Sequence, residues 1–143
     1  MAGALFLVSC VSQKRHGRTQ ARDLYLSPWF TKARQYVEAT RMPWFILSAE
    51  YGLLHPDTEV EPYERTLNLM PVAQRQDWAR RVGDALKPHL VGVQQVVVLA
   101  GERYREFLMP MLKSACPDVR VPMEGLRIGY QLEWLGANRW TGP

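Results

Sequence analysis

The sequence predicts an α/β fold, a three-layer α/β/α sandwich built around a four-stranded parallel sheet. Four short apolar runs each stop abruptly at small, polar or glycine residues, as buried strands of a parallel sheet do: residues 5–8, 44–47, 96–99 and 119–121. Helical patterns separate these runs, and such alternation favours right-handed crossovers with helices on both faces of the sheet. At 143 residues the chain has a single-domain length, so we expect one domain over residues 1–143.

A first helix is expected between the first two strands. Ser27 is a favoured N-cap residue, and Pro28 suits the first helical position. Apolar residues then recur on one face at helical spacing: Phe30, Ala33, Tyr36 and Val37. Pro43 ends this segment before the second strand.

Three more helices are expected further along the chain. The longest is predicted over residues 71–90, with its arginines exposed and with an apolar face made of Trp78, Val82, Ala85 and Leu86. A single helix is predicted over residues 102–116 and a last one over residues 128–135. We expect residues 136–143 to be a frayed end.

Residues 51–70 interrupt the alternation of strands and helices. The segment is too long for a simple connection, and long insertions of this kind are typical of lids and binding loops. A small hairpin excursion is the structural alternative.

The expected ligand site lies outside the carboxyl ends of the strands, where open parallel sheets bind ligands. Small residues at these ends allow a flat ligand to approach the backbone closely. The residues expected there are Ser9, Cys10, Ser48, Ala49, Gly52, Gly101 and Gly125.

Three charged residues are the candidates for chemistry. Lys14 follows the first strand closely enough to reach the crevice, where it could hold a phosphate, form a Schiff base or act as a nucleophile. Glu64 and Asp23 are the carboxylates expected nearest the crevice, and either could activate water or stabilise positive charge on a sugar ring. A surface lysine and solvated or capping carboxylates are the ordinary alternatives.

Four tyrosines fall on or just after the same segments: Tyr25, Tyr51, Tyr63 and Tyr104. Aromatic side chains beside a polar crevice suit stacking on a nucleobase, although many tyrosines simply lie at the edge of a core.

Charge and motifs restrict the function class. The net charge is +4, and the basic loop over residues 14–18 is compatible with a polyanionic partner. No Walker loop, GxGxxG, HExxH or GxSxG motif occurs.

The two cysteines lie far apart without metal-ligand spacing, so we expect no metal and no cofactor. The N-terminal apolar run is too short for a signal peptide or a membrane span, which predicts a cytoplasmic protein without a membrane partner.

Taken together, the motifs resemble the domains of unknown function related to YaaA and, more distantly, the lysine-transferring domain of archaeosine synthase. The matching elements are Ser9-Cys10 with Lys14, Asp23-Leu24-Tyr25, Leu47-Ser48-Ala49 with Tyr51-Gly52, Pro62-Tyr63-Glu64, Ala100-Gly101 with Tyr104, and Gly125. The resemblance implies a fold similar to that of uracil-DNA glycosylase and a role in nucleic-acid base chemistry. Beside Lys14, however, the chain lacks the proline-tyrosine arrangement of the archaeosine enzyme.

These expectations converge on a base-processing enzyme acting on DNA, with RNA as the alternative substrate. A glycosylase would stack the extruded base on an aromatic side chain, and a carboxylate such as Glu64 or Asp23 would orient water. Two alternatives stay open: a non-catalytic nucleic-acid or nucleotide-binding module, and a transferase acting on a modified base through Lys14. We expect a monomer.

Overall fold

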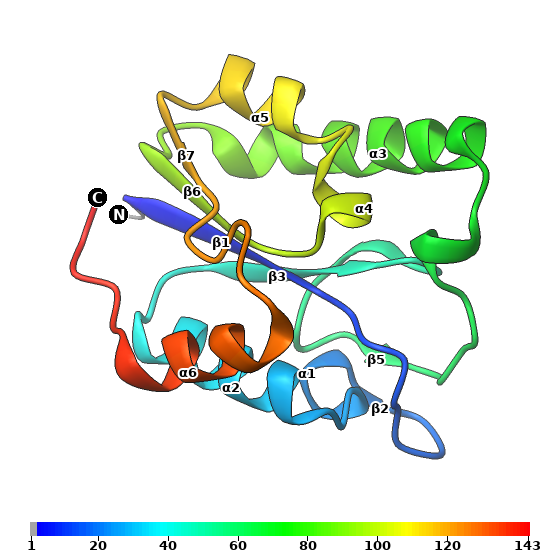
Figure 1. Ribbon diagram of the computed structural model, residues 1–143. Helices are drawn as coiled ribbons and strands as arrows, with labels where there is room; N and C mark the ends of the chain where they lie inside the picture. The colour runs from blue at the N-terminus through cyan, green and yellow to red at the C-terminus, as the bar shows by residue number, and fades with distance from the viewer. Residues whose placement is uncertain (1–2) are drawn as a thin grey trace.

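A five-stranded sheet with helices on both faces forms the fold of the computed structural model, which describes residues 3–143 (Figure 1). The strand order is β4-β3-β1-β6-β7. The strands are β1 (Ala4–Ser9), β3 (Trp44–Ser48), β4 (Gly52–Leu54), β6 (Gln95–Leu99) and β7 (Asp118–Arg120). Four of them, β3, β1, β6 and β7, run parallel and confirm the predicted strands. The sheet differs from the prediction by one edge strand, because β4 pairs antiparallel with β3.

The central strand β1 is the most enclosed part of the sheet. All six of its residues are buried, and it pairs with β3 on one side and β6 on the other. Leu7, for example, lies opposite Phe45 and Val98. Strands covered on both faces read as continuous apolar runs, which is why β1, β3 and β6 were recognisable from the sequence. β7 is partly exposed and alternates apolar with charged residues.

Helices cover the two faces of the sheet separately, as Figure 1 shows. On one face α2 (Pro28–Ala39) packs against α6 (Ile128–Ala137), with the short α1 (Ala21–Leu24) nearby. On the other lie α3 (Val72–Leu86), α4 (Glu102–Arg105) and α5 (Met109–Ala115). The predicted start of α2 is confirmed, since the Ser27 Oγ accepts a hydrogen bond from the Phe30 N–H at 3.1 Å.

The single helix expected after Gly101 is wrong, because two short helices occupy that segment. Pro110 lies in the first turn of α5, where its missing N–H costs no helical hydrogen bond. A continuous helix would place the same proline in its interior and lose such a bond.

The predicted faces of α3 also need correction. Trp78, Val82 and Leu86 are buried as expected, whereas Ala85 is exposed. Arg75 was expected on the solvent face but is buried, because its Nε donates to a Glu106 Oε1 at 3.0 Å and its Nη1 to the Met70 carbonyl at 2.6 Å. The 3₁₀ helix η2 (Lys87–Leu90) continues the chain from α3.

The insertion over residues 51–70 is partly ordered as strand and partly extended across the sheet edge. It contributes β4, the short strand β5 (Glu59–Val60), which pairs with β2 (Thr19–Gln20), and the 3₁₀ helix η1 (Leu67–Leu69). Gly52 has a φ of +70° at the tight turn from β3 into β4, a conformation that glycine adopts without strain. The first part of the insertion is therefore a hairpin, formed by β3 and β4, as the structural alternative predicted.

The C-terminal residues are docked rather than frayed, which corrects the prediction for residues 136–143. α6 continues to Ala137, and Trp140 packs edge-on against Phe6 with ring centroids 5.6 Å apart. The Trp140 Nε1 also donates to the buried Gln95 Oε1 at 2.8 Å. Within residues 3–143, helices long and apolar enough to cross a bilayer are absent.

Replacing Trp140 by alanine is expected to lower the free energy of unfolding by about 2–4 kcal/mol, because it opens a gap beside Phe6 and removes the donor to Gln95. Val91→Ala is the matched control: Val91 is 83% exposed, and its loss should change stability by less than about 0.5 kcal/mol. Urea unfolding measures both variants, and equal stabilities would show that the C-terminal residues are not docked.

Candidate functional site

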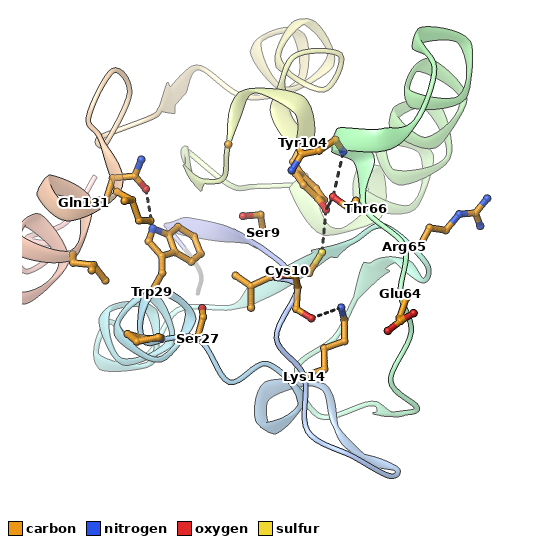
Figure 2. A pocket seen from close by; sticks show the side chains of 17 residues that line it. Ser9, Cys10, Lys14, Ser27, Trp29, Glu64, Arg65, Thr66, Tyr104 and Gln131 are labelled. Carbon is orange, nitrogen blue, oxygen red and sulfur yellow. Dashed lines mark hydrogen bonds between the residues drawn. The ribbon is translucent and has the colours of Figure 1, made fainter.

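A cavity of about 660 Å³ opens at the carboxyl ends of β1 and β6 (Figure 2). β1 lies between β3 and β6, so the chain connections of the sheet leave in opposite directions at this point. Ligands of open α/β sheets bind in such crevices. This cavity lies at the edge of the sheet where the ligand site is predicted.

Of the residues expected at the site, those that line the cavity are Ser9, Cys10, Lys14, Glu64, Gly101 and Tyr104. They come from the end of β1, from the extended part of the insertion and from the start of α4. Three segments far apart in the sequence therefore meet at one opening.

Lys14 is held in place by its backbone. It forms an isolated antiparallel bridge with Tyr25, and the hydrogen bonds from Leu26 N to Gln13 O (2.9 Å) and from Arg15 N to Leu24 O (2.7 Å) fix the residues on either side. Its Nζ donates to the Ser12 carbonyl at 3.2 Å and lies 4.3 Å from the centroid of the Tyr63 ring. The lysine therefore approaches the cavity from a fixed loop.

The ammonium of Lys14 is half-buried beside a negative charge. Burial lowers its pKa below the ordinary lysine value, and the nearby Cys10 and Glu64 oppose this change in part. Among residues 3–143, neither Lys14 nor Glu64 has a salt-bridge partner in direct contact. Figure 2 shows the two side chains toward the same end of the cavity. Two opposite charges that form no salt bridge within residues 3–143 thus line one cavity.

Cys10 and Tyr104 form the floor of the cavity between the strand ends. The Cys10 Sγ donates to the Tyr104 Oη at 3.4 Å, and the same oxygen accepts from the Leu67 N–H at 3.4 Å and lies 3.5 Å from the Thr66 Oγ1. Burial raises the pKa of Tyr104 above its usual value, so its hydroxyl stays protonated. This network ties the insertion to the ends of β1 and β6.

Trp29 and Gln131 make the opposite wall, as Figure 2 shows. The Trp29 Nε1 donates to the Gln131 Oε1 at 2.8 Å, and the Gln131 Nε2 donates to the Leu126 carbonyl at 2.7 Å. Because the indole N–H and the amide are both satisfied, the indole is fixed in orientation and presents an apolar surface to the cavity.

Tyr25, Tyr63 and Ser48 support the site from outside its lining. The Tyr25 and Tyr63 hydroxyls are 2.7 Å apart, and the fully buried Ser48 Oγ donates to the Tyr63 Oη at 2.9 Å. Burial raises the pKa of both tyrosines well above the usual value. This hydroxyl chain attaches the insertion to β3 and provides the aromatic ring under Lys14.

Other expected site residues lie elsewhere. Ala49 lines a separate depression beside α3, and Gly125 lines another with Gly101. Tyr51 is 41% exposed and bonds through its hydroxyl to the Glu61 backbone, while Gly52 shapes the turn into β4. The structure does not bring these four residues into the cavity.

Asp23 lies outside the cavity too. Its Oδ1 accepts from the Arg34 Nη1 at 2.7 Å, and it lines a different depression together with Arg22 and Glu38. The Asp23 carboxylate is already occupied in an ion pair with Arg34, so of the two candidate carboxylates Glu64 is the one at the cavity.

Sequence reasoning missed Trp29, Gln131 and Thr66. Trp29 directly follows the Ser27-Pro28 helix start and was given no role, because an aromatic residue in a first helical turn gives no sign of facing a cavity. Gln131 lies on the last helix, whose packing against α2 only the tertiary structure reveals. For the part of the chain described, groups of three or more His, Cys, Asp or Glu side chains that could hold a metal do not occur.

Comparison with known proteins gives a family. Residues 5–137 match the family of unknown function DUF6884. The chain belongs to this family. It is also 30% identical over 122 residues to the uncharacterized protein YfjM of Bacillus subtilis (strain 168), an alignment covering 83% of this chain and 79% of that protein. No solved structure matches the chain significantly. These matches do not bear on the resemblance to YaaA or to archaeosine synthase, which stays a hypothesis.

The hydroxyl chain predicts a loss of stability in alkali. Because burial raises the pKa of Tyr63, the folded protein keeps this proton above pH 10 while the unfolded chain releases it, and the free energy of unfolding falls as pH rises. Each such tyrosine contributes up to about 1.4 kcal/mol per pH unit. Urea unfolding of Tyr63→Phe between pH 8 and 11 should show a shallower fall than the wild type, and parallel curves would contradict the assignment.

Proposed function

We propose that this protein is a base-processing enzyme that hydrolyses the N-glycosidic bond of a damaged or modified base in DNA. The observation that carries the proposal is that one cavity holds a fixed indole, Trp29, together with an unpaired carboxylate, Glu64. Base excision needs both groups: a surface on which the extruded base stacks, and a carboxylate that orients water at the sugar.

The dimensions of the cavity support a nucleoside-sized ligand. A volume of about 660 Å³ lies within the range of small-molecule sites and is open to solvent on the side of Glu64, which is exposed. Trp29 offers its face to the ring of a base, and the Thr66 hydroxyl and the Ser9 hydroxyl supply polar groups nearby.

The charge distribution supports a nucleic-acid substrate. Lys14 and Arg65 line the cavity, and the exposed Arg103 and Arg127 directly neighbour two further lining residues in the sequence. Arginine and lysine at the border of a site suit contact with phosphates. The resemblance of the motifs to YaaA-related proteins, and through them to the uracil-DNA glycosylase fold, is the reason to place a DNA base before other flat ligands.

In the proposed reaction, Glu64 accepts a proton from water that attacks C1′ as the bond to the base breaks. The carboxylate also stabilises the positive charge that develops on the sugar ring. The ammonium of Lys14 counters the negative charge of the departing base or of a neighbouring phosphate.

Glu64→Gln is expected to lower the rate of abasic-site formation by about 10²-fold or more, because the amide cannot take a proton from water. The assay follows alkali-labile sites in oligonucleotides carrying a panel of damaged and modified bases. Glu61→Gln, an exposed carboxylate of the same segment that does not line the cavity, is the matched control and should retain the wild-type rate.

Three outcomes would count against this assignment. Loss of activity in Asp23→Asn but not in Glu64→Gln would show that the wrong carboxylate is chosen. No release of any base across the panel would reject the glycosylase proposal, and salt-dependent binding without product would favour a binding module instead.

Trp29→Ala is expected to weaken substrate binding by about 1–3 kcal/mol, because the base loses its stacking surface. Trp29→Phe retains a ring and serves as the control, with a smaller effect. The KM for the cleaved oligonucleotide and its Kd measured by fluorescence anisotropy check this prediction, and equal values for both variants would exclude Trp29 as the stacking residue.

A further inference from the structure

We infer that Lys14 is a nucleophile whose amine forms an imine with the C1′ aldehyde of an abasic deoxyribose, giving the protein a lyase activity on abasic DNA. This inference rests on the proposed function, since base removal leaves the sugar whose open form carries that aldehyde. It assigns to Lys14 a covalent step that hydrolysis of the glycosidic bond does not require.

The position of Lys14 suits a nucleophile. Its Nζ lines the cavity, and its loop is fixed by backbone hydrogen bonds on both sides. Its one hydrogen-bond acceptor among residues 3–143 is the neutral Ser12 carbonyl, at 3.2 Å. A lysine that serves structure is more often engaged by a carboxylate, as the exposed Lys87 is by Asp84 at 3.5 Å.

The partial burial of Lys14 favours the reactive form of its amine. Imine formation requires the neutral amine, and the partial burial of Lys14 disfavours the charged form, lowering its pKa. The groups that face it are the Tyr63 and Tyr25 rings, Cys10 and Glu64. These groups favour the charged ammonium, and burial is the effect that outweighs them.

The chemistry balances without an added oxidant or reductant. The Nζ lone pair attacks C1′, the carbonyl oxygen leaves as water, and a C1′–N imine forms. The imine acidifies C2′, its proton passes to the Glu64 carboxylate, and the C3′–O bond breaks with loss of the 3′-phosphate. Water then hydrolyses the C1′–N bond and restores the amine.

The test uses a duplex oligonucleotide with a preformed abasic site, so that the outcome does not depend on base excision. Incubation with the full chain and sodium cyanoborohydride reduces the imine to a stable amine, and the protein–DNA adduct is counted by gel and located by peptide mass mapping. We expect the wild type to form an adduct on Lys14, and Lys14→Arg to form at least about tenfold less.

Two controls sharpen the test. Lys113→Arg, an exposed lysine outside the cavity, should form as much adduct as the wild type. The same duplex with a tetrahydrofuran site, which has no aldehyde, should give no adduct. Thermal unfolding of Lys14→Arg shows whether the variant is folded, and Lys14→Met provides a second variant if it is not.

The inference is overturned if the wild type gives no adduct, if Lys14→Arg forms as much adduct as the wild type, or if the adduct maps to another amine. An adduct on Lys14 in a protein that releases no base from the panel would support this inference and reject the glycosylase proposal. The two failures are therefore distinguishable.

Discussion

The central position of β1 is the constraint on which the rest of the structure depends. All six of its residues are buried, so its backbone groups must find partners in both neighbouring strands. β3 and β6 supply these partners, and the Cys10 N–H extends the pattern by donating to the Leu47 carbonyl at 3.0 Å. The chain thus leaves β1 between the ends of β3 and β6, and the residues that follow must cross the cavity that opens there.

The crossing segment is stabilised by interactions that are weak one by one. The loop carrying Lys14 is pinned to the residues around Tyr25, and Tyr25 meets Tyr63 through its hydroxyl. Tyr63 in turn reaches Ser48 at the end of β3. This buried chain of hydroxyls is satisfied throughout, which explains how an extended insertion without a helix of its own over residues 55–66 keeps a fixed place above the sheet.

The charges of the site contrast with the buried and half-buried ion pairs of the fold. Arg75 is buried and paired with Glu106, and Arg34 is paired with both Asp23 and Glu38. Within residues 3–143, Lys14 and Glu64 lie at a cavity without salt-bridge partners, an arrangement that does not add to stability. Departures of this kind are expected where a site receives a ligand, and this is the physical basis for proposing these two residues as the reactive groups.

The sequence by itself determined the four parallel strands, the start of α2 and the edge of the sheet at which the cavity opens. These features depend on local patterns: apolar runs that stop at small residues, an N-cap serine followed by proline, and the alternation of strand with helix. Local patterns also identified Ser9, Cys10, Lys14, Glu64, Gly101 and Tyr104 as cavity residues, since all follow or face a strand end.

Only the tertiary structure decided which carboxylate is available and which aromatic ring lines the cavity. Asp23 is unavailable because it forms an ion pair with Arg34, which lies eleven residues away on a different helix. Trp29 is held in its orientation by a hydrogen bond to Gln131, near the C-terminal end of the chain. The edge strand β4 and the docking of Trp140 on Phe6 were hidden for the same reason. Each depends on contacts between segments distant in sequence, and side-chain pairing of that kind leaves no periodic signal along the chain.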